Sequence, residues 1–266
     1  MDYEDVILKK EDGIARVIIN RPDVMNAFRE QTIEELIAAF KEISLDSSLG
    51  VAVLRGAGDK SFCAGGDMSL VLGTMGDEGG GGGNMDAFNA KLIELYTVIR
   101  NLAIPVIAAV NGFAIGGGNE IQLWCDLTIA TEKSKFGQTG PKVGGMPYLA
   151  TNILPRLVGD KKTKEIIFLC KQYTAKEAEE MGWINAVVPE DKFEEVVNEW
   201  CNTILDMSPT SLKIAKISVN FGSDLLYPSM THAAYMVADY FKSEEQKEGP
   251  AAFLEKRKPN FRKFRK

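Results

Sequence analysis

The stretch that decides the fold is NGFAIGGGNEIQLWCDL, residues 111–127, which directly follows the apolar run Val106–Val110. A short, bounded apolar run of this kind predicts a buried strand. After the three glycines, apolar residues such as Ile121 and Trp124 recur at helical spacing, which places the glycines at the N-terminus of a helix. A strand, a glycine turn and a helix in this order are typical of an α/β protein.

A second glycine turn, FCAGGD at residues 62–67, follows the predicted strand Val51–Leu54. Glycine lets a ligand approach the backbone closely, and the first N–H groups of a helix have no partner inside the helix. Two such N–H groups that converge on one point would form an oxyanion hole. The turns are equally compatible with a purely structural role in packing. Neither turn matches G-x-G-x-x-G or the P-loop, which disfavours a dinucleotide or nucleoside-triphosphate site.

Around these turns, strands and helices alternate through the first two thirds of the chain, and helices fill the last third. Residues 6–20 alternate about an Asp-Gly turn pair and predict a β-hairpin. Thr32 and Thr174 each stand three residues before a glutamate, a pattern that predicts helix N-caps in capping boxes. The sequence therefore predicts an α/β core with a helical C-terminal appendage.

Two glycine-containing segments predict loops. Residues 73–86 read GTMGDEGGGGGNMD, and glycine loses so much backbone entropy on ordering that we expect a mobile loop, placed over the site. A long helix over about residues 85–102 should follow it. Residues 136–148, FGQTGPKVGGMPY, predict a second loop.

The composition excludes several kinds of site. The 266 residues carry a formal net charge of −6 and a single histidine, His232, which excludes multi-histidine metal sites. The four cysteines lack a C-x-x-C pair, so they indicate buried thiols in a reducing compartment and no zinc knuckle or disulfide frame. No stretch resembles a signal peptide or is long enough to span a bilayer, so we expect a cytoplasmic protein without a membrane partner.

The charge is unevenly distributed. Residues 253–266 contain seven cations and one anion, so this tail carries +6 and the preceding residues carry −12. The acidic body argues against a nucleic-acid binder. A short basic patch suits a small, highly charged ligand such as a nucleotide phosphate, and a solvated tail is the alternative.

Taken together, several motifs resemble the crotonase (enoyl-CoA hydratase/isomerase) superfamily over essentially the whole chain. The matching segments, in the order of the family, are NRPDVMNAF, FCAGGD, NGFAIGGGNEI, FGQTGPKVG, LPRLVG, YTAKEAEEMGWINAVVP and EGPAAFLEKRKPNFRKF. The resemblance implies an α/β spiral of ββα turns over residues 1–200 and a helical trimerisation region with a basic tail over residues 201–266. It also implies homotrimers that pair into hexamers, acyl-CoA thioester substrates, and no cofactor beyond the coenzyme A of the substrate.

The resemblance also implies roles for individual residues. A thioester enolate would be held by the backbone N–H groups of Gly66 and Gly117, which agrees with the physical interpretation of the two turns. The CoA moiety would lie against two segments near the glycine turns and against the basic tail. The residues concerned are Asn26, Ala27, Ala64, Lys256, Arg257 and Lys258.

Glu120, after the glycine triplet, is the predicted acid–base group. Apolar surroundings would raise its pKa towards neutrality and make it a usable base, whereas the structural alternative is an acid that complements the helix dipole. Hydratases of the family carry a second glutamate at about the position of Gly140, which this chain lacks. The polar groups expected to assist Glu120 are Gln138, Thr139, Tyr148 and Tyr240. Structural or interfacial roles are expected for Asp67 and His232.

Three functions follow from the resemblance. The loop FGQTGPKVG and the basic C-terminus resemble those of 2-ketocyclohexanecarboxyl-CoA hydrolase and dihydroxynaphthoyl-CoA synthase, which favours hydrolytic ring cleavage of an alicyclic β-oxoacyl-CoA. The Ser and Asp that follow this loop in those enzymes are absent, and VGGMPYLATNILPRLVG is closer in spacing to hydratases of cyclic dienoyl-CoA esters. Hydration of a cyclic enoyl- or dienoyl-CoA is therefore the alternative. A non-catalytic CoA-ester binding protein is the third.

Overall fold

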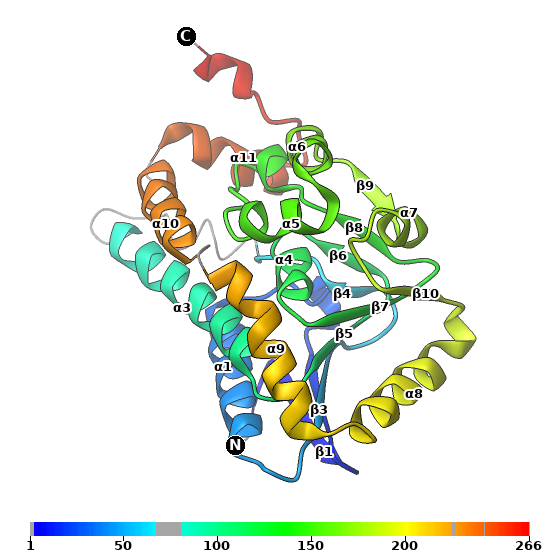
Figure 1. The fold of residues 1–266 in the computed structure, drawn as a ribbon. Coiled ribbons are helices and arrows are strands. Elements are labelled where there is room, and N and C mark those ends of the chain that lie inside the picture. Colours follow the sequence, from blue (N-terminus) through cyan, green and yellow to red (C-terminus); the bar gives the residue numbers. More distant parts are fainter. Residues whose placement is uncertain (1–2, 68–80, 225–226, 242, 266) are drawn as a thin grey trace.

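Two β-sheets form the centre of the chain (Figure 1). The computed structural model describes residues 3–67, 81–224, 227–241 and 243–265. The larger sheet has the order β1-β2-β3-β5-β7-β10 and is parallel except for the β1–β2 hairpin. Its strands are β1 (Val6–Glu11), β2 (Ile14–Ile19), β3 (Val51–Gly56), β5 (Val106–Val110), β7 (Leu127–Thr131) and β10 (Ala186–Val188). The hairpin and the strand before the glycine triplet are thus confirmed.

Both faces of the larger sheet are covered, which explains why its central strands are apolar throughout. Side chains alternate between the faces of a strand. On β3, Val51 and Val53 pack in the cluster formed with helix α8, whereas Ala52 and Leu54 pack in the larger cluster that contains the apolar faces of α1 and α3. In Figure 1, α8 lies on the opposite side of this sheet from α1 and α3.

The smaller sheet positions the candidate site. It has the order β4-β6-β8-β9, from β4 (Ser61–Cys63), β6 (Phe113–Ile115), β8 (Lys135–Gly137) and β9 (Gln172–Thr174). The first three strands are parallel, so their carboxyl ends meet at one edge of the sheet. The segments that leave this edge are the two glycine turns and the start of the FGQTGPKVG loop. Strand β8 takes up residues that we expected to lie in a loop, because their backbone pairs with β6 and β9.

The helices follow the predicted order. They are α1 (Glu30–Ser44), α3 (Gly81–Asn101), α4 (Gly117–Leu123), α5 (Ala150–Val158), α6 (Asp160–Leu169), α7 (Ala175–Glu180), α8 (Phe193–Leu205), α9 (Pro209–Asp224), α10 (Tyr227–Phe241) and α11 (Glu244–Leu254). The short 3-10 helices are η1 (Pro22–Val24), η2 (Gly140–Val143), η3 (Glu190–Lys192) and η4 (Phe261–Phe264). The capping box at Thr174 is confirmed, because its hydroxyl accepts from the N–H of Glu177 at 3.2 Å.

Two boundary predictions were wrong. Arg29 is the N-cap of α1, and Thr32 lies inside the first turn, where its hydroxyl accepts from the Arg29 N–H at 3.1 Å. Helix α3 begins at Gly81, so residues 81–86 of the predicted loop are helical. Packing of α3 against α1 outweighs the low helix propensity of its glycines. The rest of the glycine-rich run, up to residue 80, lies outside the described residues.

The C-terminal helices are fastened to the core by buried cations. The Lys216 ammonium on α9 donates to Asp126 Oδ2 at 2.6 Å and to the Ile104 carbonyl at 3.0 Å. Arg100 on α3 pairs with Asp224 at the end of α9, with 2.8 Å between Nη2 and Oδ1. The boundary expected at residue 200 falls within α8. A separate oligomerisation role for this region stays a prediction.

Gly118 sets the distance between β4 and α4. A Cβ on Gly118 would lie 2.0 Å from the Cys63 carbonyl oxygen. We expect Gly118→Ala to lower the free energy of unfolding by about 1–3 kcal/mol or more, because backbone must move to relieve the overlap. Urea unfolding followed by circular dichroism measures this. The matched control is Gly66→Ala, whose Cβ would lie 3.6 Å from the Phe28 ring; equal midpoints for the two variants would contradict the packing argument.

Candidate active site

The two glycine turns are in contact. A Cβ on Gly65 would lie 3.1 Å from the nitrogen of Gly117 and 3.1 Å from the carbonyl oxygen of Ile115. Gly65 also has a φ of +99°, a conformation that favours glycine. Gly65 is therefore required both by its backbone conformation and by the space available. The two turns thus lie side by side in the fold.

The backbone N–H groups of Gly66 and Gly117 have no hydrogen-bond acceptor among the described residues. Phe28 donates to the Gly65 carbonyl at 2.8 Å and accepts from the Asp67 N–H at 2.9 Å, and the Gly66 N–H between them takes no part in this bridge. Gly117 is the first residue of α4, so its N–H has no partner in the helix. Within the described residues neither group donates a hydrogen bond, and both glycines line one cavity.

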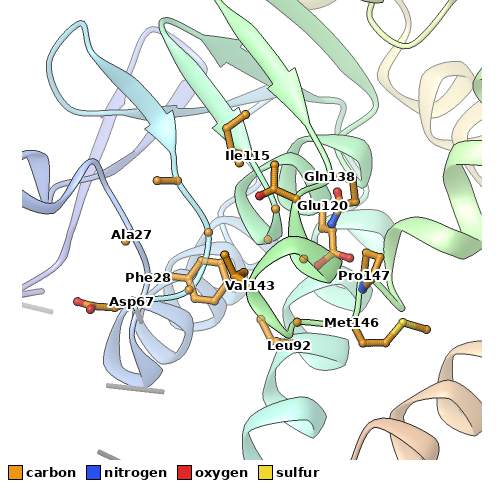
Figure 2. A pocket seen from close by; sticks show the side chains of 18 of the residues that line it. Ala27, Phe28, Asp67, Leu92, Ile115, Glu120, Gln138, Val143, Met146 and Pro147 are labelled. Atoms are coloured by element: carbon orange, nitrogen blue, oxygen red, sulfur yellow. The ribbon is translucent and has the colours of Figure 1, made fainter. Parts of the chain in front are cut away.

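This cavity has a volume of about 560 Å³, within the range of small-molecule sites. Its lining is mainly apolar and comes from several distant segments, as Figure 2 shows for Phe28, Leu92 and Ile115. The polar side chains in its lining are Asp67, Asn89, Glu120, Gln138, Thr139, Tyr148 and Gln246. An apolar cavity strengthens the electrostatic effect of each polar group that faces it.

Glu120 lies in the first turn of α4 and is 6% exposed. Its Oε1 accepts from the Ala150 N–H at 3.0 Å, and it forms no ion pair among the described residues. Burial raises the pKa of Glu120 to about 8, and the N–H groups of Ala150 and Leu149 oppose part of the rise. The Glu120 carboxyl can thus gain or lose a proton near neutral pH.

The raised pKa makes the stability of the protein depend on pH. Folded Glu120 keeps its proton up to a pH of about 8, whereas the unfolded side chain loses it near pH 4.5. Between these values the folded state binds more protons, so this group destabilises the fold increasingly as pH rises. As pH rises, we expect the free energy of unfolding of Glu120→Gln to increase relative to that of the wild type, by up to about 1.4 kcal/mol per pH unit. Denaturant unfolding from pH 5 to 8 tests this, and a difference independent of pH would contradict it.

The segment after β8 places Gln138, Thr139 and Gly140 on the cavity. Gln138 is fixed because its Oε1 accepts from Asn119 Nδ2 at 2.8 Å, and in Figure 2 it lies close to Glu120 on the same wall. Gly140 carries no carboxylate, and a Cβ there would lie 3.0 Å from the Gly145 carbonyl oxygen. This segment therefore contributes an amide and a hydroxyl to the cavity, and Glu120 is the only glutamate in the described lining.

The two predicted tyrosines lie in different places. Tyr148 lines the cavity, is 4% exposed, and donates from its hydroxyl to Asn89 Oδ1 at 3.0 Å. Burial, followed by the charge of Glu120, raises the pKa of Tyr148. Tyr240 lies half-buried on α10 and is not among the cavity-lining residues of the described chain. Its predicted contribution to catalysis stays a prediction.

The residues predicted to contact CoA near the glycine turns fall into two groups. Ala27 and Ala64 line the cavity. Asn26 is almost fully buried, and its amide donates to the carbonyls of Ala57 and Ser61 at 2.9 and 2.7 Å, which holds the loop in place. Asp67 lines the cavity and pairs with Arg21 at 3.2 Å.

The basic tail is organised by one carboxylate. Glu248 on α11 accepts from Arg257 Nη1 at 2.6 Å, from the Asn260 N–H at 2.8 Å and from Lys263 Nζ at 2.9 Å. The hydrogen bond from Arg257 is the main reason that the pKa of Glu248 falls to about 2. Arg257, which we expected at a CoA phosphate, is thus engaged within the chain. Lys256 and Lys258 are exposed and form no ion pair among the described residues.

The cysteines and the histidine are not among the cavity-lining residues of the described chain. All four cysteines are free thiols, and Cys63 and Cys201 are buried. His232 is exposed on α10. In the part of the chain that the structure describes, no cluster of three His, Cys, Asp or Glu side chains could hold a metal ion. Over the same residues, no helix combines the length and apolarity that crossing a membrane requires.

Two polar residues of the lining were not predicted. Asn89 lies in α3 between the apolar residues Phe88 and Leu92, and Gln246 lies in the first turn of α11. A polar amide among the apolar positions of a helix is the signal that points to Asn89. No comparable signal marks Gln246.

Comparison with known proteins agrees with this geometry. Residues 9–264 match the family described as enoyl-CoA hydratase/isomerase, so the chain belongs to this family, the crotonase superfamily. The chain is similar to the crystal structure of an enoyl-CoA hydratase from Mycobacterium avium subsp. paratuberculosis K-10, with 26% identity, 97% of this chain and 99% of that chain covered, and a TM-score of 0.87. The predicted crotonase-type α/β fold is confirmed.

Two further solved structures are similar over nearly the whole chain. An enoyl-CoA hydratase from Bacillus anthracis is 30% identical, with 97% of this chain and 98% of that chain covered and a TM-score of 0.78. A methylmalonyl-CoA decarboxylase in complex with 2-nitronate-propionyl-CoA is 27% identical, with 97% and 98% covered and a TM-score of 0.85.

Proposed function

We propose that this protein adds water to an acyl-CoA thioester through a thioester enolate, and that the reaction is hydrolytic cleavage of the ring of an alicyclic β-oxoacyl-CoA. The observation that carries the proposal is that Gly66 and Gly117, whose N–H groups donate no hydrogen bond within the described residues, line the same apolar cavity as Glu120. Fixed N–H dipoles stabilise the negative charge that develops on a thioester oxygen.

The steps need one acid–base group. The Glu120 carboxylate takes a proton from water, and the water oxygen bonds to the carbon of the ring ketone. The resulting alkoxide collapses to a carboxylic acid, and the bond between this carbon and the α-carbon breaks. Its electron pair forms the enolate, whose oxygen accepts from Gly66 and Gly117. Protonated Glu120 then returns its proton to the α-carbon, so one water is added in total.

A single carboxylate is sufficient because the same proton leaves water and reaches the α-carbon. This matches a described lining in which Glu120 has no ion-pair partner and Gly140 replaces a second acid. The other carboxylate of the described lining, Asp67, is paired with Arg21. Gln138, held by Asn119, would orient the attacking water.

Cleavage of a C–C bond is also consistent with one of the similar structures. This structure is named methylmalonyl-CoA decarboxylase, and decarboxylation breaks a C–C bond. It is in complex with a CoA derivative. The ring-cleavage proposal rests further on the loop FGQTGPKVG and on the basic C-terminus.

Hydration of a cyclic enoyl- or dienoyl-CoA is the second candidate, favoured by the similar structures named enoyl-CoA hydratase. Here Glu120 would activate the same water for attack on the β-carbon of an alkene. The oxyanion hole and the proton transfer would be unchanged, and the electrophile alone would differ.

The basic tail is the predicted contact for the CoA moiety of the substrate. We expect its phosphates to approach Lys256 and Lys258, whose ammonium groups are exposed. We also expect a trimer or hexamer in which the C-terminal helices meet neighbouring subunits. Size-exclusion chromatography with light scattering tests the assembly.

Incubation with defined CoA esters tests the reaction. Purified protein is given 2-oxocyclohexanecarboxyl-CoA or cyclohexadienecarboxyl-CoA, and product masses are read before and after methyl esterification. Ring cleavage gives a water adduct of the first ester with a new free carboxylate. A water adduct of the second ester without one would favour the hydratase. If both esters bind but neither is converted, the protein is a CoA-ester binding protein and the catalytic proposal fails.

A further inference from the structure

We infer that the side-chain amide nitrogen of Asn89 donates a hydrogen bond to the oxygen of the substrate carbon that water attacks. In the proposed reaction this is the oxygen of the ring ketone. The inference rests on the proposed function and adds a specificity-determining residue to it. It starts from a polar atom that the fold leaves without a partner.

Asn89 is 4% exposed and lines the cavity. Its Oδ1 accepts from the Tyr148 hydroxyl at 3.0 Å, which fixes the orientation of the amide. Its Nδ2 is buried and has no hydrogen-bond partner among the described residues. Buried polar groups are nearly always paired, so a buried donor at the wall of a ligand cavity indicates that the ligand supplies the acceptor.

The position of Asn89 relative to Glu120 follows from one short segment. Residues 148–150 hold both side chains, because the Tyr148 hydroxyl binds Asn89 and the Ala150 N–H binds Glu120 Oε1 at 3.0 Å. The charge of Glu120 also acts on the Tyr148 hydroxyl and contributes to its raised pKa. Both side chains line one cavity, and we expect a carbon attacked by the water at Glu120 to direct its oxygen towards Asn89.

Asn89 Nδ2 is a hydrogen-bond donor, so the ligand group that pairs with it must be an acceptor. An N–H donor binds a carbonyl oxygen and binds it more strongly as negative charge develops on that oxygen during attack. The other unpaired side-chain amide of the described lining, Gln246, is left with its Oε1, an acceptor that a ketone oxygen cannot satisfy. Asn89 is therefore the group suited to the ketone.

A binding experiment separates this role from turnover. All proteins carry Glu120→Gln so that the ester is not consumed, and calorimetry compares 2-oxocyclohexanecarboxyl-CoA with cyclohexanecarboxyl-CoA, which lacks the ketone. With Asn89 intact we expect the oxo ester to bind about tenfold more tightly, the effect of one satisfied hydrogen bond. Asn89→Leu should abolish this preference without weakening binding of the plain ester.

Three further variants keep the test decisive. Asn89→Leu with Tyr148→Phe removes both partners of the hydrogen bond and should fold and behave as Asn89→Leu does. Tyr148→Phe alone removes the hydrogen bond that orients the amide and should reduce the preference. Asn152→Leu is the matched control, because Asn152 is buried and its amide is already satisfied by the Tyr148 carbonyl at 2.7 Å; its preference should be unchanged.

The outcomes distinguish this inference from the proposed function. Equal binding of the two esters with Asn89 intact, or an equal loss of preference in Asn152→Leu, overturns the role of Asn89. A preference that depends on Asn89 supports it, even if the wild type does not cleave the oxo ester. In that case the proposed ring cleavage fails while the assignment of Asn89 as an oxygen-binding group stands.

Discussion

Glu120→Gln is expected to reduce turnover of the acyl-CoA substrate by ~10²–10⁴, with little change in its dissociation constant. Glutamine has nearly the same shape as glutamate and preserves the acceptor for the Ala150 N–H. It lacks the basic oxygen that takes a proton from water, and this proton must also be returned to the α-carbon. The loss should therefore appear in kcat, and steady-state kinetics together with calorimetry measure both quantities.

The pH profile of the wild type tests the same role. As a base, Glu120 must be ionised in the free enzyme, and its pKa of about 8 means that it is mostly protonated at neutral pH. We expect kcat/KM to rise about tenfold per pH unit below pH 7 and to level off above about 8. A profile that falls over this range would show that the protonated acid is the active form. Full activity in Glu120→Gln would remove this residue from the mechanism.

The sequence predicted the parts of the site that depend on local backbone. Strand β5 and helix α4, with the glycine triplet at its start, lie where the sequence predicted them. The short strand β6, which directly precedes the triplet and belongs to the smaller sheet, was not predicted. The alternation of apolar residues likewise predicted the β1–β2 hairpin. Both features are fixed by short-range sterics and by a simple hydrophobic period, which a single sequence contains.

Contacts between distant segments could not be predicted in the same way. Thr32 fits an N-cap pattern, yet its hydroxyl donates to Asp5 at 2.5 Å and lies inside the helix, because the N-terminal strand packs there. Arg257 is bound by Glu248, nine residues earlier, a pairing that was not predicted from the sequence; its contact with a CoA phosphate stays a prediction. Asn89 joins Tyr148 across 59 positions of the chain. Such pairings depend on tertiary packing, which overrides local pattern.

Gly66→Pro is expected to lower kcat/KM by ~10²–10³, equivalent to about 3–4 kcal/mol of transition-state stabilisation. Proline has no N–H, so the variant removes one of the two donors proposed to hold the enolate oxygen. The Gly66 N–H donates no hydrogen bond within the described residues, so its loss breaks no contact seen in the fold. Gly66 is a better site than Gly117, where a Cβ would lie 2.6 Å from the Phe28 ring.

Gly66→Ala is the matched control for the proline variant. It retains the N–H and adds a Cβ at an ordinary contact distance, 3.6 Å from Phe28, so its activity should stay close to that of the wild type. Far-UV circular dichroism melts establish that both variants are folded at the assay temperature. Equal activity of folded Gly66→Pro and Gly66→Ala would exclude the Gly66 N–H from the oxyanion hole. A large loss in the proline variant alone would assign the effect to the missing donor, because both substitutions fill the space next to the backbone.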